Sequence, residues 1–304
     1  MSVRIGIGTG LGRPLAVEDY WRLVQFCEAH DIDSIWHSDQ LLRPSLEPVV
    51  MLAALAAMTK TLRFGMNAVV VSYRDPLILA KECATIDYLA PGRLLPVFGV
   101  GDAADPAWKA TGRGTRGRGE RANEAIALIR RLLSEQAVSF HGQHFQYDNV
   151  AIEPRPGRPI PIWIGGQSEA AIRRTAALGD GWLGGLTAPK IAGTVVARIK
   201  AALKDTGRRI EADHYGVVIP FRVGGTDDQP ILSFQQAMIA RGRVSPEEPP
   251  MIAVGDKATV VNVFRQYIDA GISKFVAIPL SGDAQDLQRQ MLHLVQDICP
   301  EVED

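Results

Sequence analysis

Residues 161–183, PIWIGGQSEAAIRRTAALGDGWL, hold the pattern that decides the fold. A short apolar run ends in two glycines, and a second apolar run begins at Gly181. Between the two runs, Ala171, Thr175 and Leu178 share one face of an amphipathic helix pattern. We therefore predict a strand, a helix and a second strand in this order, which is the repeating unit of a parallel α/β sheet.

The same unit recurs along the whole chain. Apolar runs that are each followed by a helix pattern are predicted as strands over Val3–Gly8, Ser34–His37, Arg63–Val71, Leu94–Val100, Pro161–Ile164, Gly181–Leu183, Tyr215–Val223 and Lys274–Ile278. Eight such units in order are typical of a (β/α)8 barrel, which needs roughly 250 residues. We predict one α/β domain over residues 1–304. It is expected to be a (β/α)8 TIM barrel with insertions at its C-terminal face and a binding site at the carboxyl ends of its strands.

A doubly wound open sheet is the alternative architecture. Such a sheet is expected to carry a glycine fingerprint directly after an early strand. The spacing G-x-G-x-x-G does occur at Gly112, Gly114 and Gly117, but these glycines follow no predicted strand. We therefore favour the barrel.

Two segments interrupt the regular pattern. Residues 137–150 place three aromatic residues around a His-Gly pair, which predicts a β-hairpin insert. Residues 224–250 are polar and rich in Pro and Gly. Because long loops over an active face often act as lids, we expect this segment to be a lid or a binding loop.

Composition and charge argue against several functional classes. The net charge is −1 and both signs are spread along the chain, so no nucleic-acid partner is expected. Cys27, Cys83 and Cys299 form no C-x-x-C pair and are expected to be reduced core thiols, which indicates a reducing compartment. No N-terminal signal core is present, and no apolar run approaches the ~20 residues of a membrane span. We expect a cytoplasmic protein with no membrane partner.

The strongest functional signal is the glycine turn of the opening stretch. Gly165 and Gly166 end a strand and let a ligand approach the backbone closely. Ser168 is the expected N-cap of the next helix, whose first amides and positive dipole end favour an anion. We predict a phosphate site over Gly165, Gly166, Gln167 and Ser168. The alternative is a tight strand-to-helix turn that binds no ligand.

Polar side chains also follow other predicted strands. His37 and Asp39 come at the end of the second strand, and either has a pKa range suited to proton transfer. Asp102 follows two glycines after the fourth strand and is expected to face the same opening. For His37 and Asp39 the alternative is an ordinary hydrogen-bonded loop residue.

Two further polar residues lie within or near the ends of strands. Asn67 interrupts the apolar third strand, and Arg222 near the end of the seventh could anchor an anionic substrate. A core amide bonded to the backbone and a surface arginine are the alternatives. His141 and His144 lie in the predicted hairpin without a neighbouring third ligand, so no metal site is predicted.

The order of these motifs resembles that of the luciferase-like flavin and deazaflavin oxidoreductases, a superfamily of β/α barrels. The matching segments are residues 52–56, 75–76, 84–87, 91–94, 99–101, 118–121, 161–166, 178–183, 254–256 and 269–272. The likeness is close over roughly residues 31–185 and again over 253–279. The motifs are specific for the superfamily but not for one reaction.

The resemblance implies a cofactor, either flavin mononucleotide (FMN) or the deazaflavin coenzyme F420, with its phosphate on the glycine turn. It also implies a non-proline cis peptide bond at Asn67-Ala68 beneath the ring and an acidic residue near the ring at Asp102. The pattern Gly179–Trp182 is typical of the deazaflavin-type subset.

One residue departs from the pattern of the deazaflavin members. Many of them have Asp-His where this chain has Asp39-Gln40. A glutamine side chain cannot act as an acid or base near neutral pH. If the reaction needs proton transfer at this point, His37 or Asp39 is expected to supply it.

Three hypotheses follow. The first is hydride transfer between coenzyme F420 and a small organic substrate, which Gln40, Trp182 and Arg222 are expected to contact. The second is a monooxygenase that uses reduced FMN and oxygen. The third, of another class, is a flavin-binding protein without turnover. Members of the superfamily commonly pair, so a homodimer is expected.

Overall fold

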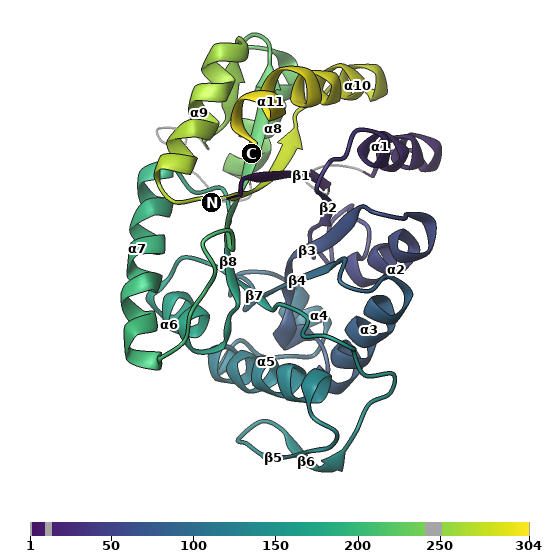
Figure 1. Ribbon diagram of the computed structural model, residues 1–304, viewed down its shortest axis with the longest axis vertical. Helices are drawn as coiled ribbons and strands as arrows, with labels where there is room; N and C mark the ends of the chain where they lie inside the picture. Colours follow the sequence, from purple (N-terminus) through teal and green to yellow (C-terminus); the bar gives the residue numbers. More distant parts are fainter. Residues whose placement is uncertain (1, 10–13, 241–250, 304) are drawn as a thin grey trace.

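Eight parallel strands close into a barrel in the computed structural model, which describes residues 2–9, 14–240 and 251–303 (Figure 1). The barrel strands are β1 (Arg4–Thr9), β2 (Ser34–His37), β3 (Arg63–Val70), β4 (Leu94–Gly99), β7 (Trp163–Gly165), β8 (Gly181–Gly184), β9 (Tyr215–Val223) and β11 (Lys274–Pro279). Their hydrogen-bonded order is β9-β11-β1-β2-β3-β4-β7-β8, and β8 pairs with β9 to close the ring. The predicted (β/α)8 barrel is confirmed.

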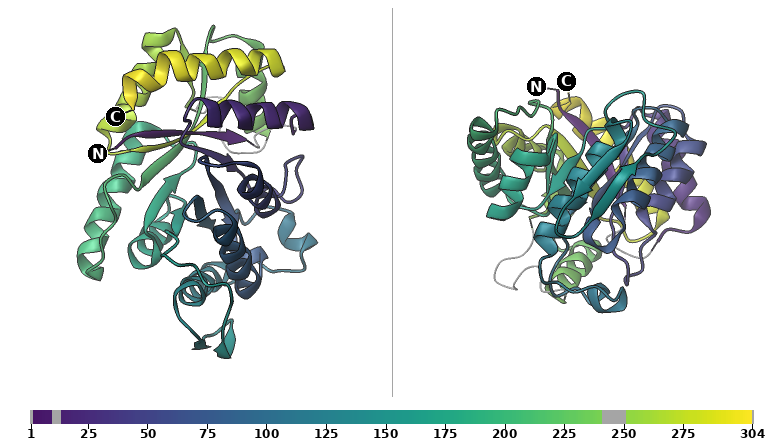
Figure 2. Two further views of the ribbon diagram at one scale, coloured as in Figure 1. Left: turned by 45° about the vertical axis from the view of Figure 1, so that its right-hand side comes forward. Right: turned by 90° about the horizontal axis from the view of Figure 1, so that it is seen from below.

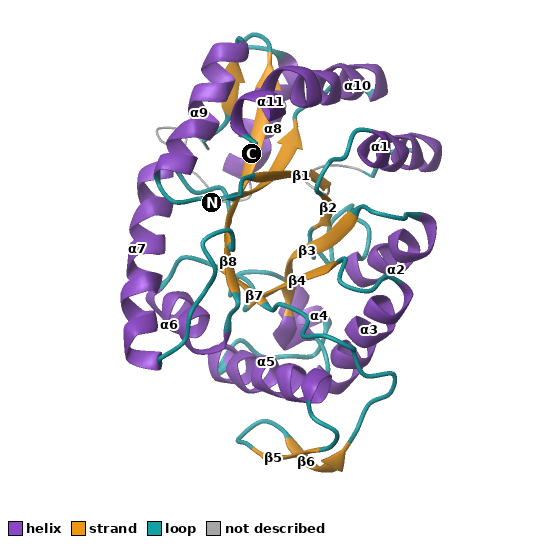
Figure 3. Cartoon of the chain, in the orientation of Figure 1, coloured by secondary structure: helices purple, strands orange, loops and turns teal. Residues whose placement is uncertain are grey.

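Helices surround this ring and connect consecutive strands (Figure 3). The outer helices are α1 (Val17–Ala29), α2 (Pro48–Met58), α3 (Pro76–Leu89), α5 (Arg118–Ser134), α6 (Glu169–Leu178), α7 (Pro189–Thr206), α9 (Lys257–Asp269) and α10 (Ala284–His293). Shorter elements are the 3-10 turn η1 (Val71–Tyr73), α4 (Ala107–Ala110), the π-helical turn η2 (Leu294–Ile298) and α11 (Cys299–Val302). Within the described ranges, no helix is long and apolar enough to cross a membrane.

Two of the three hydrophobic clusters form separate layers because strand side chains alternate between the two faces of the sheet. The larger cluster lies between the strands and the surrounding helices and includes Ile5, Ile35 and Phe64. The smaller cluster contains Trp36, Leu95, Val97, Trp163, Leu183 and Val276. It takes residues from five barrel strands and fills the interior, so the ring is a packed core and not a pore.

The two predicted inserts have different outcomes. Residues 137–150 form the predicted antiparallel hairpin of β5 (Val138–His141) and β6 (Gln146–Val150), which projects below α5 in Figure 2. The expected loop over residues 224–250 is partly wrong, because α8 (Gln229–Ala240) occupies much of it. Ile231, Phe234 and Met238 bury one face of this helix at helical spacing. The rest of the expected lid, residues 241–250, lies outside the described residues.

One short strand was not predicted. β10 (Ala253–Gly255) pairs in parallel with the end of β9, outside the closed ring. It has only three residues, which is too short for a readable period. Figure 2 shows α8 and α4 at one end of the barrel, while the two chain termini lie together at the other end.

Candidate active site

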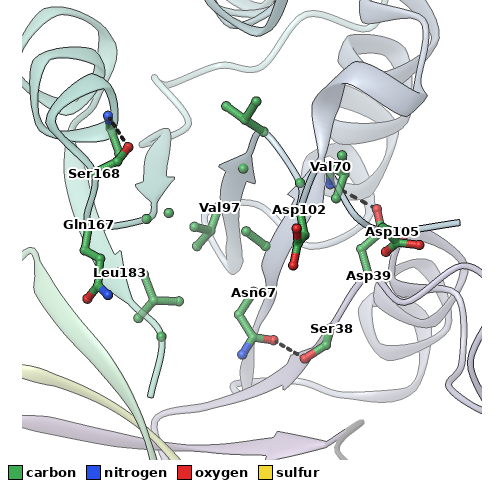
Figure 4. Close-up of a pocket in the computed structure, with 18 of the residues that line it drawn as sticks. Ser38, Asp39, Asn67, Val70, Val97, Asp102, Asp105, Gln167, Ser168 and Leu183 are labelled. Atoms are coloured by element: carbon green, nitrogen blue, oxygen red, sulfur yellow. Dashed lines mark hydrogen bonds between the residues drawn. The ribbon is translucent and has the colours of Figure 1, made fainter. Parts of the chain in front are cut away.

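A cavity of about 930 Å³ opens at the carboxyl ends of the barrel strands (Figure 4). Its walls come from the ends of β2, β3, β4, β7 and β8, and Met238 of α8 reaches its rim. The apolar floor contains Ala68, Val97 and Leu183, which belong to or pack against the interior cluster. This is the face of the barrel on which ligand sites are found.

The glycine turn lies in the wall of this cavity, between β7 and α6. Gly166 has φ +108°, a backbone conformation that side chains other than glycine rarely adopt. A Cβ built there would lie 3.2 Å from the Cβ of Ala171 in the first turn of α6. The Ser168 hydroxyl accepts a hydrogen bond from the Ala171 amide at 3.2 Å and caps the helix. The predicted arrangement of glycine, cap and helix start is therefore present.

Trp182 is hydrogen-bonded to the glycine turn and does not line the cavity. Its indole Nε1 donates to the Gly166 carbonyl at 2.7 Å, and the residue is completely buried. The expectation that Trp182 contacts the substrate is thus not met by its position. Gln167 does line the cavity, and its side-chain oxygen accepts from the Thr187 hydroxyl at 3.1 Å.

Cationic side chains line the same cavity. Arg43, Arg118 and Arg174 are all part of its wall. The Arg118 Nε is buried and has no hydrogen-bond partner, whereas the Arg174 Nε donates to the Asn123 side chain at 2.6 Å. The three guanidinium groups place positive charge around the cavity. The wall is therefore suited to an anionic ligand group.

The third strand contains the cis peptide bond that the resemblance implies. The Asn67-Ala68 bond is cis, and both residues line the cavity. The Ser38 hydroxyl donates to the Asn67 side-chain oxygen at 3.3 Å (Figure 4). The register of β3 against β4 shifts at this point, between Met66 and Val69.

Asp39 lines the cavity but its carboxylate is engaged with β3 and a cation. Its Oδ2 accepts from the Val70 amide at 3.0 Å and from Arg74 at 3.2 Å, and Arg74 also pairs with Glu47. Burial raises the pKa of Asp39, and the Arg74 charge partly offsets this shift. The side chain thus fixes the strand that carries the cis peptide.

His37 faces away from the barrel interior. Strand pleating directs Trp36 inward and His37 toward α1, where its Nε2 lies 2.9 Å from the Tyr20 hydroxyl. The Thr9 hydroxyl donates to the Trp36 carbonyl, so the His37 Nδ1, 3.0 Å from that hydroxyl, must be the donor. His37 is therefore a neutral ring with Nδ1–H. Its expected role at the glycine-turn cavity is not supported by this position.

The burial of His37 predicts a pH-dependent stability. Burial lowers the pKa of His37 from 6.5 to about 4, so the unfolded chain binds the extra proton first. Stability is then complete above pH ~6.5 and falls as the pH drops toward ~4, by about 3 kcal/mol at most. We expect His37→Gln to show a correspondingly smaller loss between pH 7 and 4 in urea unfolding. His141→Gln, at an exposed histidine of the hairpin, should keep the wild-type slope; equal slopes for all three proteins would contradict the assignment.

Asp102 occupies the loop after β4 and points into the cavity on the side of Asn67 and Ser38 (Figure 4). The Ala104 amide donates to its Oδ1 at 3.0 Å, and Trp108 donates to its carbonyl at 2.7 Å. Gln40 also lines the cavity. Asp102 is exposed to this opening, in contrast to the buried Asp39.

Arg222 does not line the cavity. Its guanidinium pairs with Asp228 at 2.7 Å and with Asp286 at 2.8 Å, and it also donates to the Leu280 carbonyl. Two carboxylates and a carbonyl saturate its charge, so the expected role as an anchor for an anionic substrate is not met by its position. In the described part of the chain, no group of three or more His, Cys, Asp or Glu residues could hold a metal ion.

Some site residues escaped the sequence analysis. Arg174 lines the cavity but lies in no recognisable motif, and Ser38 lies between His37 and Asp39 without a predicted role of its own. Arg118 appears in the sequence analysis only within the segment 118–121 that resembles the superfamily. Arg118 directly follows Gly117 and is the first residue of α5, and this position at a helix start was the signal that could have indicated a site residue.

The chain matches the luciferase-like monooxygenase family over residues 1–243, and it belongs to this family. The match includes the glycine turn, the cis peptide and the Asp102 loop. It agrees with the fold and with the resemblance that the sequence motifs indicate.

Similar proteins use both types of cofactor. An F420-dependent glucose-6-phosphate dehydrogenase of Kineococcus radiotolerans is 29% identical over 193 residues, which cover 60% of this chain and 57% of that protein. The chain thus spans little more than half the length of the first curated relatives it matches. An F420-dependent secondary alcohol dehydrogenase has the same fold, with a TM-score of 0.84, 19% identity and full coverage of both chains. The oxygenating component of 3,6-diketocamphane monooxygenase from Pseudomonas putida, solved with FMN, has a TM-score of 0.80, 14% identity and 99% coverage of both chains.

Proposed function

We propose that this chain is an oxidoreductase that transfers a hydride between coenzyme F420 and a small organic substrate. The observation that carries the proposal is the cavity in which the Gly165–Ser168 turn and three arginines surround an apolar floor. An anionic group fits the turn and the arginines, and a flat ring fits the floor. A monooxygenase that uses reduced FMN is the alternative, since both cofactor types occur among similar proteins.

The residues present fit such a cofactor. The phosphate would be held by the amides after Gly166 and the Ser168 cap, at the positive end of α6. Arg43, Arg118 and Arg174 line the same cavity and offer positive charge to the acidic part of the ligand. The cis peptide at Asn67-Ala68 and Val97 would lie beneath the ring. When bound, the cofactor supplies the hydride chemistry, and the barrel supplies position and electrostatics.

The proton that accompanies hydride transfer needs an acceptor or donor on the protein. Asp102 is the group that we assign to this role, because it is exposed and its carboxylate reaches into the cavity, whereas the Asp39 side chain is only 3% exposed. Gln40 cannot titrate in this range, and His37 is held by Tyr20. Asp39 acts as a positioning residue for the third strand.

Cofactor choice is tested by titration. Purified protein is titrated with oxidised F420 and, separately, with FMN, and binding is followed by fluorescence quenching. We expect F420 to bind at least tenfold more tightly. Tighter binding of FMN would support the monooxygenase alternative. Binding of F420 without turnover of any substrate would favour a flavin-binding protein without catalysis.

Asp102→Asn tests the proton acceptor. We expect kcat for substrate oxidation to fall by about 100-fold, as for loss of a general base, while the affinity for F420 changes less than about threefold. Asp105→Asn is the matched control, because Asp105 lines the same cavity and, like Asp102, accepts the amide two residues on through its Oδ1. We expect this variant to keep kcat within about threefold of the wild type. An unchanged kcat in Asp102→Asn would place the proton transfer on another group.

A homodimer through the outer face of α2 and α3 is also part of the proposal. These adjacent helices expose Val50, Met58, Ile78, Tyr88 and Leu89, each at least half accessible. An exposed apolar patch of this kind is typical of an interface. We expect Ile78→Asp to convert the dimer into a monomer in multi-angle light scattering. Ile191→Asp, at an exposed isoleucine on α7, should leave it dimeric; a monomeric wild type would contradict the proposal.

The cytoplasm is the compartment that we propose for this protein. Cys27 and Cys83 are buried free thiols, and Cys299 is free and partly buried. Free cysteines are typical of proteins in a reducing compartment.

A further inference from the structure

A second cavity, of about 790 Å³, opens at the same end of the barrel. It lies beside the first cavity, which holds the glycine turn and which we call the cofactor cavity. It lies at the ends of β1, β2 and β11, between α1, α8 and α10. Ser38 and Ile278 line both cavities. A ligand in the second cavity would therefore be next to the contents of the first.

The walls of this second cavity are largely apolar. The side chains that give it this character are Ile7, Leu15, Leu23, Leu46, Phe234 and Leu287. They come from β1, α1 and the loop before it, the loop after β2, α8 and α10, so an apolar chain between them would be enclosed on several sides. Burying such a chain is favourable by roughly 25 cal/mol per Å² of its surface.

The charges that line the second cavity are unsuited to an anion. Among its described lining residues the only charged ones are Asp19 and Asp283. Asp19 pairs with Arg22 at 2.7 Å, and Asp283 caps α10 by accepting from the Asp286 amide at 2.8 Å. The cofactor cavity, in contrast, has three arginines in its wall. A phosphate or carboxylate in the second cavity would lose its hydration without gaining a cation.

Most polar side chains that line the second cavity are uncharged, and Ser38 is the one that it shares with the cofactor cavity. The rings of His37 and Tyr20 line it, but both are already hydrogen-bonded to each other. Ser38 stands at the boundary, and its hydroxyl donates to Asn67 in the cofactor cavity. A ligand would thus place its single polar group at the boundary and its apolar chain in the second cavity.

We propose that the second cavity holds the apolar chain of an uncharged alcohol, or of the ketone formed from it, with the oxygen-bearing carbon at the boundary beside Ser38. This inference rests on the proposed function. In the oxidation direction, the C–H bond of the carbinol would break, and the bound deazaflavin would supply the acceptor for its hydride and thus for the two electrons. Asp102 would take the hydroxyl proton, and a C=O bond would remain.

The first test measures binding without the cofactor. Octan-2-one is titrated into the cofactor-free protein by calorimetry, and octyl phosphate serves as an anionic probe with the same chain. Both titrations use the Gly166→Val variant, whose glycine turn should no longer accept a phosphate, and in it we expect octan-2-one to bind at least tenfold more tightly than octyl phosphate. Equal or tighter binding of octyl phosphate by this variant would overturn the assignment of an uncharged ligand.

Two variants of α8 test whether the apolar chain of the ligand lies in the second cavity. Ala237→Trp places an indole in the wall of the second cavity, whereas Leu232 lies on the exposed side of the same helix and lines neither cavity. We expect Ala237→Trp to weaken octan-2-one binding at least tenfold and Leu232→Trp to change it less than twofold. Wild-type affinity in a folded Ala237→Trp protein would overturn the proposal.

Kinetics and cofactor binding separate this proposal from the proposed function. With F420, Ala237→Trp should lower kcat/KM for octan-2-ol at least tenfold and leave that for propan-2-ol within about twofold. The affinity for F420, measured by fluorescence quenching, should be unchanged in both α8 variants. Failure of the wild type to bind F420 would contradict the proposed function alone, because octan-2-one binding is measured without the cofactor.

Discussion

Gly166→Val is expected to reduce cofactor affinity at least 100-fold while the barrel stays folded. A φ of +108° is rarely reached by any residue with a Cβ and is least accessible to a β-branched one. The new Cβ would also lie 3.2 Å from Ala171 in the first turn of α6. The turn must then change shape, and its amides would no longer converge on the phosphate that we propose they bind. A 100-fold loss corresponds to about 2.7 kcal/mol of binding free energy.

The measurement is fluorescence quenching by F420, with circular dichroism to check the fold. Gly185 offers a matched control, because it lines the same cavity and a Cβ there would meet no atom within 4 Å. We expect Gly185→Ala to bind within about threefold of the wild type and Gly166→Ala to lose most of its affinity. Wild-type binding by folded Gly166→Val would place the phosphate elsewhere.

The barrel and the glycine turn could be predicted from the sequence because both have strong local signals. Apolar runs followed by helical spacing recur eight times, and all eight predicted runs overlap barrel strands. At the turn, the glycines, Ser168 and the helix pattern are contiguous, so the local sequence specifies the local structure.

The errors concern residues whose partners are distant in the sequence. Arg222 stands at a strand end, as an anchor would, but Asp286 comes 64 residues later and pairs with it. Trp182 lies in a motif beside the site, yet its nitrogen is directed at Gly166 behind the turn. Neither contact leaves a periodic signal along the chain. α8 was not predicted for another reason. The segment around it is polar and rich in Pro and Gly, which predicts a loop, and the helical spacing of its apolar residues is too short to indicate otherwise.

The two ends of the barrel carry different kinds of polar residues. The carboxyl end carries the cavities, where polar groups face space that a ligand could fill. At the amino end, Asp33 precedes β2 and forms ion pairs with Lys274, the first residue of β11, and with Arg63, the first residue of β3. Asp33 also accepts from the Ser34 hydroxyl at 2.6 Å. This division follows the general rule that the amino end of such barrels serves stability.

Asp33→Leu is therefore expected to lower the free energy of unfolding by about 3–5 kcal/mol. The side chains of Asp33 and Lys274 are only 2% and 7% exposed, so removal of the carboxylate leaves a buried ammonium without its counter-charge. Urea unfolding measures the loss. The double variant Asp33→Leu with Lys274→Met should recover most of it, because an apolar pair of similar volume removes the uncompensated charge. If the double variant were instead less stable by the sum of the two single losses, the ion pair would not be the cause, and the packing of β11 against β1 would have to account for the effect.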